Sequence, residues 1–244
     1  NNYYLSDKST LIWHPLWNKL SYNTVEGVNI HADLDYRLKL DSMKSITIGT
    51  KVRYAFSSKR WNSILFTRFD FKRRLQEGNL TLTGGRYISQ INPNNPIPFW
   101  WNMVYTLFLR KNYMKLFERD FVDLKLKWPF ASTLLGDFSI ELAEKRSLEN
   151  TSDFSFFNRE AEFTPNNPTN IIIGDTRFDP YRIFSAGLSF DYMPFLKYTI
   201  KNGRKSIING SSPVFTLGYK YGKAFEGTDF TYNHLFAKVK YGNR

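Results

Sequence analysis

Residues 28–40 read VNIHADLDYRLKL, and apolar and polar side chains alternate along the whole stretch without a break. A two-residue period over this length is typical of a β-strand with one apolar face. Such a face must lie against either a second layer of protein or lipid. The remaining sequence has to decide between these two environments.

The same alternation recurs along the chain and predicts nine strands in all. The eight further segments are 46–56, 61–71, a fourth strand beginning at 80–82, 122–128, 138–145, 184–192, 214–221 and 235–241. Short turns at 41–45 and 57–60 connect the first three strands, which favours an antiparallel meander.

Charge suggests a register for the first hairpin. If the position numbers of facing residues sum to 86, Asp35 lies opposite Lys51 and Asp33 opposite Arg53. Opposite charges on directly facing positions stabilise an antiparallel pair, whereas a sum of 88 would oppose Arg37 to Lys51. We therefore expect the register of 86.

The composition fits a membrane-spanning sheet. Aromatic residues make up 18% of the 244 residues and charged residues 23%. Apolar runs long enough for a spanning helix are missing, but a barrel strand needs only about nine to eleven residues. Cysteine is absent, which excludes disulfides and thiolate metal sites. The net charge of +12 favours anionic lipids or solutes, and nucleic acid ranks last because the basic residues form no dense block.

The connections differ in length between the two ends of the predicted sheet. Segments 84–120 and 146–181 are long and fall at the same end, as in outer-membrane barrels with long extracellular loops. The first is expected to hold a short amphipathic helix that plugs or caps the sheet, or grips a ligand. Its apolar side is carried by Trp100, Val104, Leu107, Met114 and Phe117. Segment 193–211, with the turn signal Asn202-Gly203, is expected to form an extended hairpin.

The sequence assigns no catalytic residue, metal ligand or cofactor. His31, Asp33 and Asp35 share a strand face, but residues two apart on a strand lie roughly 7 Å apart, too far for compact chelation. Neither a nucleophile elbow nor a phosphate loop is present. The carboxylates Asp123, Asp137, Glu141 and Glu144 alternate with lysines, which favours a cross-strand ion network.

The charged stripe of the strands is expected to face a lumen. Its candidate residues are His31, Asp33, Asp35, Arg37, Lys51, Arg53, Lys125, Lys127, Glu141 and Lys145. The lysines and arginines could form a basic wall that attracts anions, or could simply balance the neighbouring carboxylates. Aromatic residues near strand ends could form a girdle: Tyr36, Tyr54, Trp61, Trp128, Tyr192 and Tyr221.

Four segments resemble one protein family. They are YNTVEG (22–27), GGRYISQINPNNPIP (84–98), RKNYMKLFERDF (110–121) and AEKRSLENTSDFSFF (143–157). The resemblance is to a Bacteroidetes outer-membrane family of unknown function, in which a carboxypeptidase-regulatory-like domain precedes a β-barrel. It implies a barrel in the outer membrane and brings no reaction. The chain lacks that domain and a terminal aromatic residue, so we expect a fragment of the barrel region.

Together these observations predict an all-β, antiparallel up-and-down transmembrane β-barrel segment. It should have about nine or ten strands in one domain over residues 1–244, long extracellular loops and one short loop helix. The expected location is the outer membrane of a Gram-negative bacterium. The expected partners are outer-membrane lipid, lipopolysaccharide and envelope proteins, in a non-enzymatic role in transport or envelope assembly.

The main alternative is a soluble, secreted β-sandwich that binds glycans or a protein. It would bury Leu34, Leu38 and Val52 under a second sheet, whereas a barrel would leave them accessible. A hydrolase assembled from the long loops would require a nucleophile and a carboxylate near His14, His31 or His234.

Overall fold

The computed structural model describes residues 2–14, 19–73, 75–92, 95–157, 160–167, 178–201, 204–208 and 212–241. Its first seven strands are β1 (Asn2–Tyr4), β2 (Ser9–Trp13), β3 (Leu20–Asn23), β4 (Gly27–Lys39), β5 (Lys44–Ala55), β6 (Arg60–Arg73) and β7 (Gln76–Gln90). Helix α1 (Phe99–Leu109) follows. The later strands are β8 (Leu116–Ala131), β9 (Leu134–Ser147), β10 (Tyr181–Tyr192), β11 (Tyr198–Lys201), β12 (Arg204–Ile207), β13 (Val214–Glu226) and β14 (Thr231–Lys240).

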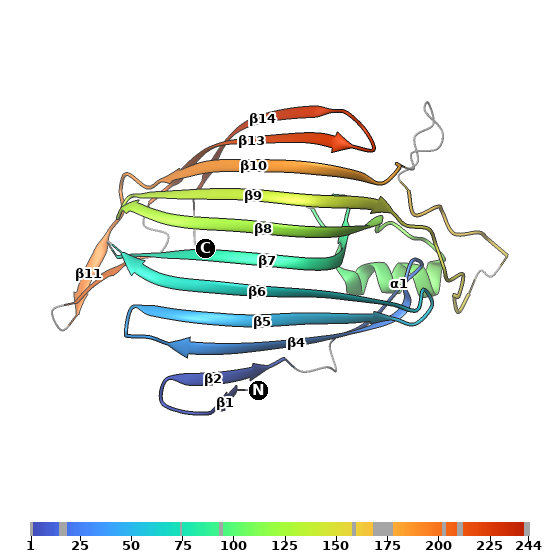
Figure 1. The fold of residues 1–244 in the computed structure, drawn as a ribbon, viewed down its shortest axis with the longest axis horizontal. Helices are drawn as coiled ribbons and strands as arrows, with labels where there is room; N and C mark the ends of the chain where they lie inside the picture. The colour runs from blue at the N-terminus through green and yellow to red at the C-terminus, as the bar shows by residue number, and fades with distance from the viewer. Residues whose placement is uncertain are drawn as a thin grey trace.

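The strands form one antiparallel 12-stranded sheet in the order β1-β2-β4-β5-β6-β7-β8-β9-β10-β13-β14, with β3 also paired to β4 (Figure 1). This order confirms an all-β meander, since neighbours along the chain are neighbours in the sheet. Within the described part of the chain no ladder joins β14 to β1, β2 or β3, so the sheet is open.

All nine predicted strands are present, as β4–β10, β13 and β14. The expected total of nine or ten was too low, because β1, β2 and β3 contain only three to five residues and are too short to show an alternation. The expected hairpin at 193–211 is present as β11 and β12. Its turn signal, Asn202-Gly203, lies outside the described residues.

The predicted register of the first hairpin is wrong. Asp33 lies opposite Lys51 and His31 opposite Arg53, so facing position numbers sum to 84. The turn explains the shift: the Leu40 N–H donates to the Lys44 carbonyl over 3.0 Å, and the Asp41 side chain accepts from the Met43 N–H over 2.6 Å. The turn therefore sets the register, and charge pairing between β4 and β5 does not.

The two long loops are shorter than expected because strands extend into them. β7 continues to Gln90 and β8 begins at Leu116, inside the segment 84–120. Helix α1 confirms the expected loop helix but ends at Leu109, so Met114 and Phe117 lie outside it. No helix among the described residues is both long enough and apolar enough to cross a membrane.

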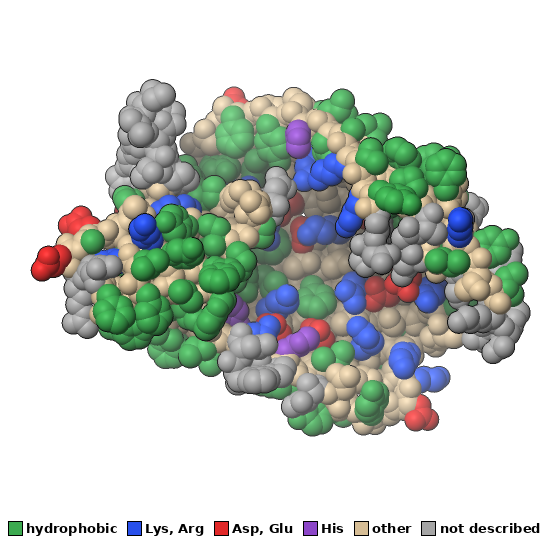
Figure 2. Space-filling model, turned by 180° about the vertical axis from the view of Figure 1, so that it is seen from behind, with side chains coloured by type: hydrophobic (Ala, Val, Ile, Leu, Met, Phe, Trp, Pro, Cys, Tyr) green, Lys and Arg blue, Asp and Glu red, His purple; other side chains and the backbone are tan. Residues whose placement is uncertain are grey.

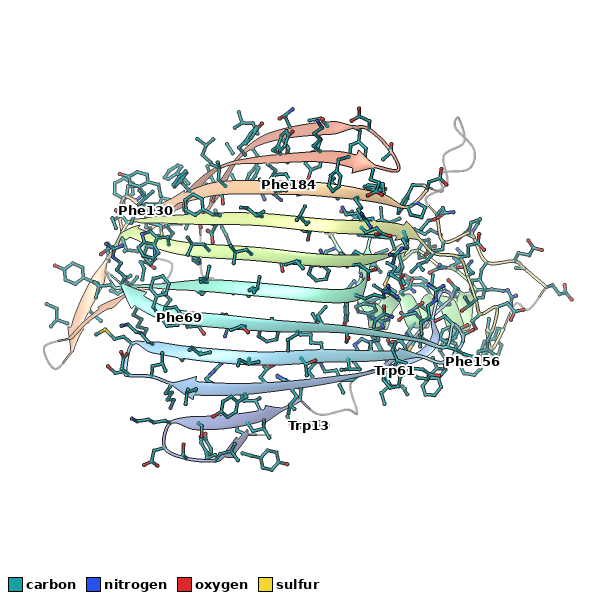
Figure 3. All side chains as sticks on the ribbon, viewed as in Figure 1. Trp13, Trp61, Phe69, Phe130, Phe156 and Phe184 are labelled. Atoms are coloured by element: carbon teal, nitrogen blue, oxygen red, sulfur yellow. The ribbon has the colours of Figure 1, made fainter. Side chains whose placement is uncertain are left out.

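The sheet has one apolar face and one polar face. Large side chains of the apolar face are widely exposed, with Leu82 at 50%, Leu142 at 52% and Leu217 at 57%. Leu34 and Val52 are half-buried rather than covered. The described residues contain no second sheet except the two-stranded β11–β12 pair. Figure 3 shows the side chains on the sheet, with Phe69 and Phe184 labelled from the apolar face.

The sheet is curved, and its hollow side carries the polar face. Figure 2 shows Lys, Arg, Asp and Glu side chains gathered in this hollow. Directly opposed residues on neighbouring strands share a face. The strand registers therefore place Asp33 on β4 and Lys220 on β13 on the same, polar face. The strands thereby present a concave charged surface.

Candidate functional site: the polar face and its loop cap

The charged candidates predicted from sequence share the polar face and form two groups. One group lies on β4 and β5, and the other on β8 and β9. The first comprises His31, Asp33, Asp35, Arg37, Lys51 and Arg53, and the second Lys125, Lys127, Glu141 and Lys145. Strands β6 and β7 separate the two groups in the sheet.

The carboxylates on β4 take their partners from the edge of the sheet. Lys19 Nζ lies 2.6 Å from Asp33 Oδ2, and His14 Nε2 lies 3.2 Å from Asp35 Oδ2. The expected pairs with Lys51 and Arg53 therefore do not form, because nearer partners come from the chain before β4. Among the residues that the structure describes, no group of three His, Asp or Glu side chains could hold a metal ion.

On β8 and β9, basic side chains form ion pairs with nearby carboxylates of the same strand or the neighbouring strand. Arg119 Nη1 lies 2.7 Å from Glu141 Oε2, and Lys125 Nζ lies 2.5 Å from Asp123 Oδ2 on its own strand. The Lys145 ammonium lies 5.6 Å from the centre of the Phe117 ring. This part of the face is an ion network.

A buried ion pair lies where β3 turns into β4. Arg53 Nη2 donates to Glu26 Oε2, and both side chains are almost completely buried. Asn23 Nδ2 donates to the same Glu26 oxygen over 2.7 Å. Burial raises the pKa of the Glu26 carboxyl, and the adjacent Arg53 guanidinium opposes this rise. The pair ties the β3–β4 turn to the polar face of β5.

Helix α1 lies over this ion pair with its polar side inward. The Phe99 ring lies 5.4 Å from the Arg53 guanidinium and meets the His31 ring edge-on at 6.3 Å. Asn102 and Thr106 are completely buried, and the Asn102 side chain accepts from the Met114 N–H over 3.0 Å. The sequence predicted an apolar side but not its orientation, and in the structure the polar side packs inward because the helix rests on polar loop backbone.

We call the assembly formed by residues 23–26, 98–115, 148–157 and 160–167 the loop cap. Asn112 Nδ2 donates to Thr24 Oγ1 over 2.7 Å, and Thr24 Oγ1 donates to Asn150 Oδ1 over 2.7 Å. The Asn166 amide donates to the carbonyls of Leu116 and Leu148, each over 2.6 Å, and its oxygen accepts from the Leu116 N–H. These bonds fix the long loops to the end of the sheet.

Because the polar side of α1 is buried, its aromatic side is exposed. Rings of α1 contact rings of the second long loop, with Phe108 5.4 Å from Phe156 and 6.0 Å from Phe157. The exposed aromatic residues of the loop cap are Phe99, Trp100, Trp101, Tyr105, Phe108, Tyr113, Phe154, Phe156 and Phe157.

A row of charged residues crosses the apolar face near its loop end. Arg86, Asp120, Glu144, Arg182 and Glu226 lie directly opposite one another on β7, β8, β9, β10 and β13. Ion pairs run along it: 2.6 Å between Arg86 and Asp120, 3.1 Å between Glu144 and Arg182, and 2.8 Å between Arg182 and Glu226. We call these five residues the ion row.

Sequence reasoning missed Glu26 and the ion row, and only the ion row left a signal. Glu26 belongs to the YNTVEG segment, whose polar residues do not alternate and so indicated no strand face. Arg86, Asp120, Glu144 and Arg182 occupy positions near the loop end where the alternation predicts apolar residues, and a register shift beside Arg182 brings Glu226 into the row. A charged residue at the same level on several predicted strands could have revealed the row.

Comparison with known proteins identifies a family whose function is unknown. Residues 1–243 match the model described as "Family of unknown function (DUF5686) C-terminal domain". Neither the curated proteins nor the solved structures contain a significant match. The family match covers all the strands, so it applies to the sheet and loop cap together.

Proposed function

The chain therefore belongs to the DUF5686 family, as its C-terminal domain, and on this premise we propose that it forms part of the wall of a transmembrane β-barrel. The apolar face contacts lipid, and the polar face lines a water-filled lumen. The barrel lies in the outer membrane of a Gram-negative bacterium, surrounded by lipid and lipopolysaccharide. Its role is non-enzymatic, in transport or envelope assembly, with envelope proteins as partners.

The uncovered apolar face carries this proposal. Val122, Leu142 and Leu217 are each more than half exposed, and equivalent side chains cover the face from β4 to β14. An apolar surface of this extent is rare on a soluble protein unless a partner or a membrane covers it. Lipid on one side and water on the other also explains why most of the charged residues, apart from the ion row near the loop end, lie on the opposite face.

The height of the apolar face matches a bilayer. On β10, ten residue steps lead from Arg182 in the ion row to Tyr192 at the short-turn end. Ten strand residues span about 33 Å, and the usual barrel tilt of roughly 40° reduces this to about 25 Å, the height of an outer-membrane apolar band. The ion row then lies at the boundary with the headgroups, where charge is tolerated.

Aromatic side chains gather at both limits of this band. Near the loop end the Tyr54 ring lies 5.0 Å from Phe56 and 4.6 Å from Trp61. Near the short turns, the Phe71 and Trp128 rings lie 5.4 Å apart. Aromatic girdles of this kind occupy the two interfaces of outer-membrane barrels.

The alternative of a soluble β-sandwich receives less support. A sandwich requires a second sheet packed on the apolar face at about 10 Å. The described residues provide only the β11–β12 pair besides the main sheet, and Leu82 and Leu142 remain exposed. A secreted binding module would have to cover this face with another protein.

Spin labelling on neighbouring positions tests the proposal. These 244 residues contain no cysteine, so Leu82→Cys on the apolar face and Thr81→Cys on the polar face of β7 can each be labelled alone in full-length protein in liposomes, once any cysteine elsewhere in that protein is replaced by serine. We expect oxygen to relax the label at position 82 and a water-soluble nickel chelate to relax the label at position 81. Tyr113→Cys, in the loop cap, serves as a water-exposed control.

Equal access of the nickel chelate to both β7 labels would contradict the membrane assignment. Conductance across planar bilayers then distinguishes the two roles, because a transport role requires a permeable lumen. An assembly role instead requires a stable complex with an envelope protein that survives detergent extraction.

A further inference from the structure

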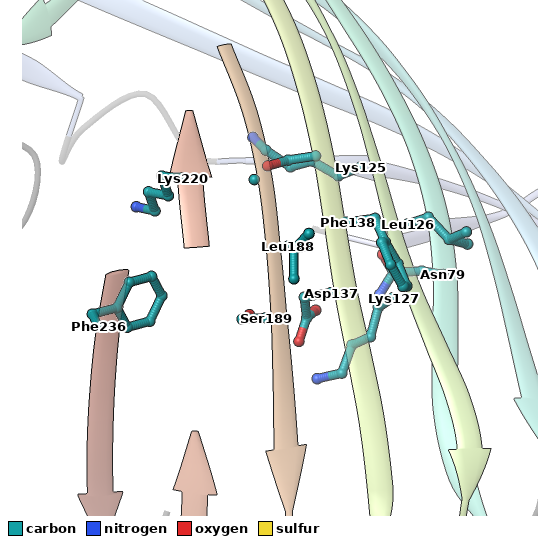
Figure 4. A pocket seen from close by; sticks show the side chains of 12 residues that line it. Asn79, Lys125, Leu126, Lys127, Asp137, Phe138, Leu188, Ser189, Lys220 and Phe236 are labelled. Atoms are coloured by element: carbon teal, nitrogen blue, oxygen red, sulfur yellow. The ribbon is translucent and has the colours of Figure 1, made fainter. Parts of the chain in front are cut away.

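The polar face contains a cavity of about 310 Å³ near the end of the sheet that carries β13 and β14. Figure 4 shows its lining, with lysines of β8 on one flank and Lys220 and Phe236 on the other. The side chains that define it come from β8, β9, β10, β13 and β14. They are Lys125, Lys127, Ser139, Ser189, Lys220 and Phe236.

Small residues between long ones create the cavity. In one cross-strand row, Ser139 and Gly187 lie between Lys125 and Lys220. A β-carbon on Gly187 would lie 2.7 Å from Ser139 Oγ, so any larger residue there would begin to fill the floor. The lysine side chains therefore stand as walls around a floor of hydroxyl groups and backbone.

The lining combines positive charge, hydroxyl groups and an aromatic ring. Lys125, Lys127 and Lys220 contribute three ammonium groups, against the carboxylate of Asp137 in the lining and that of Asp123 beside Lys125. On the far wall, the Phe236 ring has the Lys220 and Lys238 ammonium groups 5.8 and 5.0 Å from its centre. The cavity thus attracts anions while offering hydrogen bonds and an apolar surface.

We infer that this cavity binds an acidic saccharide of one or two rings. The lysines pair with the carboxylate or phosphate of the sugar, and the Ser139 and Ser189 hydroxyls bond to sugar hydroxyls. Sugar C–H groups pack on Phe236. A volume of about 310 Å³ lies at the small end of ligand sites, which excludes longer glycans from complete enclosure.

This inference names a class of solute for the proposed lumen. It rests on the proposed function because the lumen is the route by which the solute reaches the cavity. Binding itself is measured in detergent and does not require membrane insertion. Failure of the spin-label test and failure of the binding test are consequently separate outcomes.

Isothermal titration of the full-length protein tests the site. The probes are digalacturonate, glucose 6-phosphate, a neutral digalactoside and inorganic phosphate. We expect at least one acidic sugar to bind ten times or more tightly than both the neutral sugar and inorganic phosphate, and added salt to weaken it. Lys125→Gln with Lys220→Gln should raise its Kd at least tenfold.

The matched control removes the same charge elsewhere on the polar face. Lys39→Gln with Lys51→Gln, on β4 and β5, should change the Kd less than threefold because these lysines lie outside the cavity. Gly187→Ala keeps every charge and should weaken binding by narrowing the floor. Far-ultraviolet circular dichroism checks that each variant folds.

Three results would overturn the inference. Neutral and acidic sugars could bind equally, inorganic phosphate could bind as tightly as the acidic sugar, or the control pair could lose as much affinity as the cavity pair. The first two remove the assigned ligand class, and the third replaces a local site with the general field of the polar face.

Discussion

In the wall, made of β4–β10, β13 and β14, the alternation along each strand decides which face of the sheet a side chain lies on. In the loop cap, individual contacts decide the environment of each side chain. Leu82 and Thr81 are neighbours on β7 and face opposite sides. In the loop cap, Thr24 and Glu26 are both buried, and each depends on a named partner elsewhere: Asn150 in the second long loop for Thr24, and Arg53 on β5 for Glu26.

The wall and the loop cap obtain their structural specificity from different kinds of interaction. The wall repeats one interaction pattern many times, so a single substitution changes little unless it alters what a face contacts. The loop cap uses buried polar groups, which are costly when one partner is missing. Substitutions in the two regions should therefore differ in size and in their dependence on the surroundings.

The largest effect should come from breaking the buried ion pair. Arg53→Met leaves the Glu26 carboxylate buried without its counter-charge, and removal of one partner from such a pair costs about 3–5 kcal/mol. Lys72→Met, which breaks an exposed pair with Glu77, should cost less than about 1 kcal/mol. Denaturant unfolding in detergent measures both free energies, and similar losses of stability would contradict the distinction between the buried and the exposed ion pair.

A charge on the apolar face should have the next largest effect. Leu82→Arg places a guanidinium near the middle of the proposed lipid band and should cost about 2–4 kcal/mol in a bilayer. Thr81→Arg, on the polar face of the same strand, should change stability by less than about 0.5 kcal/mol. Unfolding from lipid vesicles measures the difference, and equal values would mean that Leu82 faces water.

The wall could be predicted from sequence because the alternation of apolar and polar residues is a local property of each strand. Alternation placed all nine long strands, and the short turn at 57–60 was also expected. The error in register came from Asp33 and Asp35, whose partners Lys19 and His14 belong to segments with no readable pattern. Charge pairing between two strands is a weak guide when a third segment supplies a closer partner.

The loop cap could not be predicted because its contacts join residues far apart in sequence. Asn112 bonds to Thr24, and Asn166 bonds to Leu116 and Leu148. Helical spacing located α1 but did not show which side of the helix packs against the sheet. The buried Asn102 and Thr106 show that the polar side packs inward, since the surface beneath the helix is polar.

Removal of a loop-cap amide should have an intermediate and local effect. Asn166→Ala leaves buried backbone groups of Leu116 and Leu148 without partners, at a cost of about 1–3 kcal/mol. Asn95→Ala, at an exposed loop position, is the control. Hydrogen exchange should accelerate at residues 112–116 and stay unchanged in the centre of β8; uniform acceleration along β8 would contradict a separate loop cap.

The loss of folding stability caused by Arg53→Met should depend on pH. Burial raises the pKa of Glu26, and loss of the guanidinium removes the opposing effect, so folded protein holds this proton more tightly than unfolded protein. Stability of the variant should thus fall as pH rises through the interval between the two pKa values, by at most about 1.4 kcal/mol per pH unit. Glu26→Gln added to Arg53→Met should abolish this slope, and an unchanged slope would assign it to another group.

The smallest effect should come from the ion row. Arg182 pairs with Glu144 and Glu226, but its side chain is 53% exposed, so Arg182→Ala should lower stability far less than Arg53→Met. Because water and salt screen exposed pairs, the loss should shrink further in 0.5 M salt. A loss as large as that of Arg53→Met, insensitive to salt, would place the row inside an apolar medium. The lipid boundary would then lie beyond the row, and the height of the band would have to be measured to the loop cap.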